Sequence, residues 1–331
     1  MDWRCIARRW TATSLLVCTG LAATQPATAA AADSDYPNRP VKLIVAMPPG
    51  GGLDTTARYI AKELSERFRQ PFVVENRPGG NSFIAAKAVS GATPDGYTLW
   101  LSSNSPMVTN PAVFLNLPYD PVNDYTPIAR LVRLPLVIVV PSTSPHKTLE
   151  SLMAAGRAAP GKLTYASGSA TYRVVLELVN EQHHVKANAI PYKGTTPAIT
   201  DLAAGNVDYS IGEINAVLPL VRSGKVRILA TTSARRLKDL PDVPTVAEGG
   251  APGFDFDGWI ALYGPAKMPP KLVDALAQAA DAVLRKPSTA AVIDAMSGVV
   301  YPGGPAELKS FQAAEYERAQ KVVRTANIPR E

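Results

Sequence analysis

The first residues that could do chemistry are the glycines in VKLIVAMPPGGGLDTTARYIAKEL, residues 41–64. This pattern predicts a strand, a tight turn and the start of a helix. Such a turn presents unpaired backbone N–H groups at the positive end of the helix dipole. Those groups can bind a nucleotide phosphate, a catalytic oxyanion or a small carboxylate.

Known nucleotide-binding motifs do not match this turn. A dinucleotide fingerprint requires G-x-G-x-x-G, and a P-loop requires Lys followed by Ser or Thr after its glycines. Here Gly50, Gly51 and Gly52 are consecutive, and the negative charge of Asp54 would repel a phosphate. The motif therefore argues against nucleotide binding.

Side chains suited to catalysis are few. The only histidines are His146, His183 and His184, and no G-x-S-x-G nucleophile elbow is present. Adjacent His183 and His184 cannot share one face of a helix, and no carboxylate spacing completes a metal site with them. We interpret the histidines as surface residues, and we expect no catalytic residue, no cofactor and no metal.

The first 32 residues have the features of an export signal. Three arginines precede the apolar stretch TATSLLVCTGLAA, which is too short to span a membrane, and ATAAAA offers small-residue cleavage sites. We expect cleavage near Ala32 and a periplasmic mature protein. The Arg8-Arg9 pair leaves twin-arginine export open. Cys18 leaves lipidation open, although a bulky residue precedes it.

Composition limits the class of protein further. The chain has 331 residues, of which 46% are hydrophobic and 19% charged, enough for two domains of about 150 residues each. The signal holds both cysteines, three of the 34 basic residues and one of the 28 acidic residues, so the mature chain carries a formal charge of +4 and no disulfide. Its basic residues are scattered, which argues against nucleic acid as a partner.

Strands and helices alternate along the mature chain, which predicts an α/β fold with open, mostly parallel sheets flanked by helices on both faces. The strands are expected at residues 41–47, 72–77, 97–103, 131–141, 162–168, 187–192, 207–213 and 226–233. The helices are expected at residues 54–68, 81–91, 148–159, 171–182, 196–205, 216–224, 270–287 and 305–326.

Three glycine-bearing turns join strands to helices, at residues 48–54, 77–82 and 167–171. In open α/β sheets, ligands bind beyond the carboxyl ends of the strands, where the helices begin. If the three turns face one crevice, that crevice is rich in backbone N–H donors and in the positive ends of helix dipoles.

The segment YPNRPVKLIVAMPPGGGLDTTARYIAKELSERFRQPFVVENRPGG closely resembles the Bug family of periplasmic solute-binding proteins, the receptors of tripartite tricarboxylate transporters. The resemblance continues, in the same order, through TPDGYTLWLSS, IPYKGTTPAITDLAAGNVDYSI, GKVRILATTSARRLKDLPDVPTVAEGG and GWIALYGPAKMPPKLVDALAQA. It covers nearly all of the mature chain, and several linked motifs make it far more specific than the glycine turn alone.

The resemblance implies a two-domain periplasmic-binding-protein-like fold that closes by a hinge on a small carboxylate held in the cleft between the domains. The first domain would comprise residues 33–137 and 253–331, and the second residues 138–252. The resemblance also implies membrane transporter subunits as partners, and we expect a monomer.

The resemblance further implies that the PPGGG turn contacts the ligand carboxylate partly through ordered water. This agrees with the physical chemistry, because backbone N–H groups at a helix start bind anions and a bridging water costs little free energy. The matching positions are Pro49, Gly50, Gly51, Gly52 and Asp54. Residues at the end of a predicted strand, Ser102, Ser103 and Asn104, are expected to line the same side.

The second domain departs from the family pattern. Relatives carry a longer Gly/Ser loop that ends in a histidine, whereas this chain has YASGSATYRVVLEL. Backbone and hydroxyl donors are still expected from Ser167, Gly168, Ser169, Ala170 and Thr171. Arg173 is either a bidentate clamp on a carboxylate or a solvent-facing helix residue. Glu213 either meets an amino or hydroxyl group of the ligand or favours a helix start through the dipole.

The leading functional hypothesis is a transport receptor without catalytic activity. A sensor that presents its closed form to a membrane signalling partner is the alternative. An exported enzyme is a third class, and the lack of a nucleophile–base pair argues against it. Dicarboxylates, tricarboxylates, acidic amino acids, aromatic acids and nicotinate-like acids all remain open as ligands.

Overall fold

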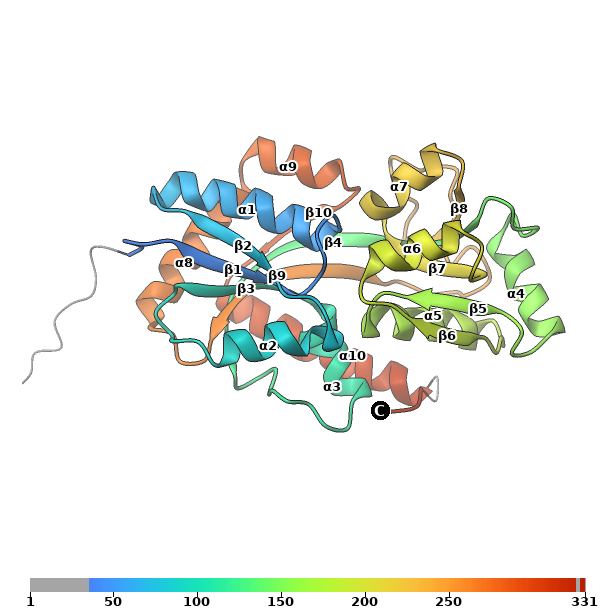
Figure 1. Cartoon of the computed structure of the whole chain (residues 1–331), viewed down its shortest axis with the longest axis horizontal. Helices are drawn as coiled ribbons and strands as arrows, with labels where there is room; N and C mark the ends of the chain where they lie inside the picture. Colours follow the sequence, from blue (N-terminus) through green and yellow to red (C-terminus); the bar gives the residue numbers. More distant parts are fainter. Residues whose placement is uncertain (1–35, 326–327, 331) are drawn as a thin grey trace, which may run out of the picture. The chain divides into compact units, whose positions relative to one another are not determined.

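A computed structural model describes residues 36–325 and 328–330 (Figure 1). The expected export signal at residues 1–32, with both cysteines, lies outside the described residues. The chain divides into two units, Met1–Tyr36 and Pro37–Glu331, and the second contains every described helix and strand. Within the described residues, no helix is both long enough and apolar enough to cross a membrane.

The strands are β1 (Val41–Val45), β2 (Phe72–Asn76), β3 (Thr98–Ser103), β4 (Tyr125–Pro141), β5 (Thr164–Ser167), β6 (Asn188–Pro191), β7 (Tyr209–Glu213), β8 (Val226–Thr231), β9 (Asp257–Pro265) and β10 (Val299–Gly303). The helices are α1 (Gly52–Phe68), α2 (Phe83–Ser90), α3 (Asn110–Val113), α4 (Leu149–Ala158), α5 (Ala170–Gln182), α6 (Thr195–Ala203), α7 (Ile214–Arg222), α8 (Pro270–Leu284), α9 (Pro287–Asp294) and α10 (Pro305–Thr325). A 3₁₀ turn, η1 (Gly80–Ser82), precedes α2, and a π-helical turn, η2 (Ser105–Thr109), precedes α3.

The strands form one mixed sheet in the order β2-β1-β3-β9-β4-β7-β5-β6, and β8 and β10 also pair with β4. Toward its two ends the pairs are parallel, β1 with β2 and β3, and β5 with β6 and β7. In the centre β4 runs antiparallel to β7, β8, β9 and β10, and β9 runs antiparallel to β3. The α/β class is confirmed, and the parallel pairing expected from the alternation holds toward the two ends.

Strand β4 joins two halves of the sheet. Its residues 125–135 pair with β9, and its residues 136–141 pair with β7 and β8. We call β1, β2, β3, β9, β10 and residues 125–135 the first half-sheet, and residues 136–141 with β5 to β8 the second half-sheet. The domain boundaries expected at 137/138 and 252/253 stay a prediction.

The second half of β4 is buried on both faces. Leu136, Ile138 and Val140 pack in one core cluster with residues of α4 and α5. The alternate residues Val137 and Val139 pack in another with residues of α6 and α7. Side chains alternate between the two faces of a strand, so an uninterrupted apolar run is typical of a strand covered on both sides. Figure 1 shows α6 and α7 on one side of this half-sheet and α4 and α5 on the other.

The first half-sheet is built around aromatic side chains. Trp100, Trp259 and Tyr263 are almost fully buried in a core cluster with Met107 of η2 and Leu308 of α10. Helices α1 and α8 pack against each other and against strands of this half-sheet. This core anchors η2, whose residues reach toward the second half-sheet.

The interpretation of the histidines as surface residues is wrong for His183. This residue ends α5 and is only 4% exposed. Its Nδ1 lies 2.8 Å from the carbonyl oxygen of Val179, and its Nε2 lies 3.0 Å from that of Gly249. The side chain therefore ties the end of α5 to a loop distant in sequence, a contact that local sequence does not reveal. His184 is exposed.

Candidate ligand-binding site

Three adjoining cavities lie where the two half-sheets meet. We name them after one lining residue each: the Glu213 cavity, about 30 Å³, the Lys193 cavity, about 280 Å³, and the Arg173 cavity, about 410 Å³. Ser169 lines all three. Because they share lining residues, the three cavities are neighbours, and we refer to them together as the crevice.

The Lys193 cavity is lined by the residues that cap the N-termini of three helices. Ser82 precedes α2, Ser169 precedes α5 and Gly194 precedes α6, and all three line this cavity together with Lys193. The first backbone N–H groups of a helix have no partner within the helix and carry a partial positive charge. This wall is therefore suited to an anion.

The turns before α5 and α6 are packed directly against each other. A Cβ atom added to Gly168 would lie 2.5 Å from the carbonyl carbon of Gly194 and 2.6 Å from the backbone N of Thr195. Gly194 has a φ of +124°, which side chains rarely tolerate, and Pro48 lies against it. Glycine at both positions lets the two helix starts reach the same cavity.

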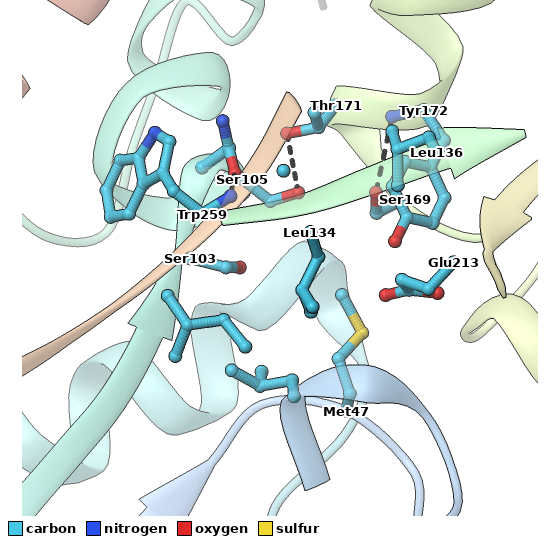
Figure 2. A pocket seen from close by; sticks show the side chains of 14 residues that line it. Met47, Ser103, Ser105, Leu134, Leu136, Ser169, Thr171, Tyr172, Glu213 and Trp259 are labelled. Atoms are coloured by element: carbon cyan, nitrogen blue, oxygen red, sulfur yellow. Dashed lines mark hydrogen bonds between the residues drawn. The ribbon is translucent and has the colours of Figure 1, made fainter. Parts of the chain in front are cut away.

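The Glu213 cavity is small and has a carboxylate in its wall. Figure 2 shows Glu213 and Tyr172 on one side, with Ser103 and Trp259 on the other. Oε2 of Glu213 accepts a hydrogen bond of 2.8 Å from the hydroxyl of Thr195. Burial, and then the charge of Glu213, raises the pKa of Tyr172 well above its ordinary value, so its hydroxyl stays neutral. The volume is enough for about one water molecule.

A cluster of buried hydroxyl groups joins the half-sheets behind this cavity. Oγ1 of Thr171, on α5, lies 2.9 Å from Oγ of Ser105 on η2 (Figure 2). It also lies 2.8 Å from Oγ1 of Thr109, at the end of the same turn. All three residues are about 3% exposed. Hydrogen bonds between buried neutral groups contribute roughly 0.5–1.5 kcal/mol each. The cluster thus fixes α5 against the first half-sheet.

The structure brings most of the predicted site residues to the crevice. Ser103, Asn104, Thr171 and Glu213 line the Glu213 cavity, Gly168 lines the Lys193 cavity, Ser167 and Arg173 line the Arg173 cavity, and Ala170 lines the last two. The hydroxyl of Ser102 is buried on β3 with no hydrogen-bond partner among the described residues.

The PPGGG turn lies beside the crevice rather than in the walls of its three cavities. Pro49, Gly50 and Gly51 are not among the residues that line them, and a Cβ on Gly50 or Gly51 would meet no atom within 4 Å. Gly52 backs onto the wall, because its Cβ would lie 2.7 Å from Leu134 and 3.5 Å from Cγ of Glu213. A direct contact of this turn with a ligand stays a prediction.

Asp54 organises this turn. It is 3% exposed, and its carboxylate accepts hydrogen bonds from the backbone N–H of Gly50, from Nε of Arg58 and from Nδ2 of Asn76. Burial alone would raise the pKa of Asp54, but the hydrogen bonds from Arg58, Asn76 and Gly50 outweigh it and hold the pKa below its ordinary value of 3.8. The carboxylate is engaged in shaping the turn.

We expect Asp54→Asn to lower the free energy of unfolding by about 1.5–3 kcal/mol near neutral pH, because hydrogen bonds to a charged group are lost. A lowered native pKa stabilises the fold above the unfolded pKa, and this contribution disappears as pH falls through the native value. The difference between wild type and variant should therefore shrink below about pH 3.8. Urea unfolding at several pH values measures it, and a difference independent of pH would contradict this assignment.

Sequence reasoning missed several residues of the crevice, namely Met47, Ser105, Tyr192, Lys193, Gly194 and Trp259. The sequence does contain a pattern that could have indicated Tyr192, Lys193 and Gly194. IPYKGTTPAIT has the same order of strand, glycine turn and helix as the three turns that were singled out. Ser105 and Trp259 carry no such local signal, because tertiary packing brings them to the crevice.

Comparison with known families agrees with this geometry. Residues 56–328 match the model of the tripartite tricarboxylate transporter family receptor. The protein BugT of Bordetella pertussis is 34% identical over 316 residues, which cover 94% of this chain and 97% of BugT.

Solved structures support the same relationship. Rpa4515 of R. palustris, determined with adipate, shares 33% identity with a TM-score of 0.87 and covers 90% of this chain and 100% of its own. The periplasmic binding protein BugD shares 28% identity with a TM-score of 0.84 and covers 89% of this chain and 100% of its own. These likenesses extend over both half-sheets, and the chain belongs to the tripartite tricarboxylate transporter receptor family, the solute-binding family that includes the Bug proteins.

Proposed function

We propose that this protein is an extracytoplasmic receptor that captures a small carboxylate in the Lys193 cavity for a membrane transporter of the tripartite tricarboxylate type. One observation carries the proposal: Ser82, Ser169 and Gly194, which cap the N-termini of three helices, line one cavity of about 280 Å³. The adipate bound to the similar protein Rpa4515 supports a carboxylate as ligand.

Binding would follow from fixed donors and charge. Backbone N–H groups at the starts of α5 and α6 would donate to the carboxylate oxygens, and Lys193 would add a positive charge. The hydroxyl of Ser169 accepts a hydrogen bond from the N–H of Tyr172 and so caps α5. This cap would fix the position of the helix start in the wall of the cavity. Ordered water would bridge the ligand to the turn at Pro49–Gly52 at little entropic cost.

Glu213 would interact with the end of a short ligand that lies opposite its bound carboxylate. Its carboxylate would repel a second carboxylate and accept a hydrogen bond from a hydroxyl or amino group. The neighbouring neutral hydroxyls of Tyr172 and Thr195 keep that carboxylate oriented. Ser103 and Asn104 would complete this wall from the first half-sheet.

Capture would involve closure of two domains about β4, which crosses from the first half-sheet to the second. The proposed domains are residues 33–137 with 253–331, and residues 138–252. The hydroxyl cluster of Ser105, Thr109 and Thr171 would hold the closed form. The receptor would act as a monomer in the periplasm after removal of residues 1–32, and it would release its ligand unchanged.

A thermal-shift panel of small carboxylates tests the proposal. The chain lacking residues 1–32 would be unfolded, refolded and assayed with di- and tricarboxylates, acidic amino acids and aromatic acids. A ligand at 100 times its Kd adds roughly 2.7 kcal/mol of stability, which raises Tm by several degrees in a protein of this size. The amide of each active acid is the matched control and should give no shift. A panel without any shift would contradict carboxylate capture.

A further inference from the structure

The turn before α2 has a strained backbone. Asn81 has a φ of 50° and Ser82 a φ of 74°, both in the left-handed region that residues with a side chain rarely adopt. In the described part of the chain, no other two neighbouring non-glycine residues share this conformation. The hydroxyl of Ser82 makes no capping hydrogen bond to α2 that could compensate for the strain. Such strain persists only where surrounding contacts fix the conformation, and it is concentrated at functional sites.

The strained turn is part of the proposed ligand wall. Asn81 and Ser82 line the Lys193 cavity, and Asn81 also lines the Arg173 cavity. The carbonyl oxygen of Asn81 lies between the two left-handed residues, and a carbonyl oxygen only accepts hydrogen bonds. If this oxygen faced the Lys193 cavity, it would repel an anion there. The direction of the Asn81 carbonyl group therefore decides whether the wall suits a carboxylate.

The side chain of Asn110 binds this carbonyl group from the protein interior. Its Nδ2 donates a hydrogen bond of 2.7 Å to the carbonyl oxygen of Asn81 and one of 3.0 Å to the hydroxyl of Tyr119. Asn110 is 0% exposed and lines none of the three cavities. The carbonyl oxygen of Asn81 is thus bound to a buried donor that lies outside the cavity wall.

The hydrogen-bond partners allow only one orientation of the Asn110 amide. The carbonyl oxygen of Asn81 can only accept, so Nδ2 and not Oδ1 faces it. The hydroxyl of Tyr119 donates its own proton to the carbonyl oxygen of Pro106, at 2.8 Å, so it also accepts from Nδ2.

This arrangement leaves Oδ1 of Asn110 buried and without a hydrogen-bond partner among the described residues. A buried acceptor without a partner lowers the stability of the fold. An amide at this position is therefore poorly explained by stability alone, and the bond that it donates to Asn81 suggests a role in shaping the ligand wall.

We propose that Asn110 is a positioning residue of the ligand site. Its amide holds Asn81 and Ser82 in the left-handed conformation and keeps the carbonyl oxygen of Asn81 away from the bound anion. Asn110 acts without contact with the ligand. When the amide is lost, the turn relaxes to negative φ and the carbonyl group is free to rotate toward the cavity. This inference rests on the proposed capture of a carboxylate in the Lys193 cavity.

Replacement of Asn110 tests the inference. Calorimetry with succinate, malate, citrate, glutamate, adipate and benzoate identifies the acid that wild type binds most tightly, and this acid is the probe for all variants. Asn110→Leu keeps the approximate volume of the side chain and removes both donated hydrogen bonds. It should weaken binding of the probe by about 10-fold, because the left-handed conformation is no longer held. If Asn110→Leu does not fold, Asn110→Ala removes the same bonds without adding an atom.

Two further variants separate affinity from stability. Tyr119→Phe removes one bond of the network and leaves the bond to Asn81 in place, so it should lose stability but bind the probe more tightly than Asn110→Leu. Asn180→Leu, or Asn180→Ala, is the matched control. Asn180 is a buried amide that accepts from the hydroxyl of Tyr209 and lines none of the three cavities. Its replacement should leave affinity within about twofold of wild type. Urea unfolding of the ligand-free proteins measures the stabilities.

A double-mutant cycle with Ser82→Gly tests the strain itself. Glycine adopts positive φ without strain, so in the Ser82→Gly background the loss caused by Asn110→Leu should shrink to about threefold or less. A residue that only stabilises the fold would cause the same loss in both backgrounds. Equal losses in both backgrounds, unchanged affinity in Asn110→Leu, or an equal loss in Asn180→Leu would overturn the inference and leave the proposed function standing. If wild type binds none of the six acids, both fail.

Discussion

Ser169→Asp is expected to abolish carboxylate binding while the fold stays intact. Ser169 lines all three cavities of the crevice, so a carboxylate at this position would occupy the wall that the ligand anion approaches. The same residue is the N-cap of α5, where its hydroxyl accepts a hydrogen bond of 3.3 Å from the N–H of Tyr172. Asp caps helices about as well as Ser, so α5 keeps its cap.

The expected loss of affinity is at least 100-fold. Two like charges about 4 Å apart repel each other by roughly 4 kcal/mol near a protein surface, which exceeds the 2.7 kcal/mol that 100-fold represents. Calorimetry with the acid identified by thermal shift would measure the loss. Urea unfolding of the ligand-free variant should agree with that of wild type within about 0.5 kcal/mol.

Thr148→Asp is the matched control. Thr148 is the N-cap of α4 and accepts from the N–H of Ser151, and it is exposed and lines none of the three cavities. It undergoes the same change from hydroxyl to carboxylate at a helix start, so it should bind the acid as wild type does. Retained affinity in Ser169→Asp, or equal losses in both variants, would contradict an anion site at the start of α5.

Local periodicity is sufficient to predict much of this fold. The run LVIVV in β4 and the helical spacing of α1, α4 and α8 are properties of short segments, and each was predicted to within a few residues. The start of β4 was predicted six residues late, at 131 instead of Tyr125. Pro127 lies in that first part, and proline argues against a paired strand. The register of β4 shifts between Pro127 and Ala129, where a bulge accommodates the proline.

The central antiparallel strand β9 could not be placed by the alternation of strands and helices. It follows 25 residues after β8 and inserts between β3 and β4, so both of its neighbours lie far away in sequence. Its pairing is decided by packing of Trp259 and Tyr263 in the core of the first half-sheet. Such long-range contacts have no signature within a local window of residues.

The site was predictable where chemistry depends on a glycine turn before a helix. Ser169 and Gly168 follow from that pattern, and Lys193 and Gly194 would have followed from the same pattern in PYKGT. The roles of Asp54 and the PPGGG turn were harder to predict from the sequence, because a carboxylate near a turn can either contact a ligand or stabilise the conformation of the loop. The bond from the N–H of Gly50 to Asp54 shows the shaping role, which sequence alone does not separate from contact with a ligand.

Gly168→Ala is expected to lower the free energy of unfolding by about 3 kcal/mol and to remove ligand binding. The added Cβ would lie 2.5 and 2.6 Å from the carbonyl carbon and oxygen of Gly194, and 2.6 Å from the backbone N of Thr195. These are backbone atoms, so no flexible side chain can move aside. The start of α6 would have to shift, and Lys193 and Gly194 would leave their positions in the Lys193 cavity.

Gly51→Ala separates this steric effect from a general cost of replacing glycine. Gly51 has a φ of −84°, which alanine adopts readily, and its added Cβ would meet no atom within 4 Å. Alanine is a poorer N-cap than glycine, so a loss of at most about 1 kcal/mol is expected. Urea unfolding of both variants measures the contrast. Equal stabilities would mean that the turns before α5 and α6 do not need their close approach, and the convergence of the two helix starts on one anion would lose its structural basis.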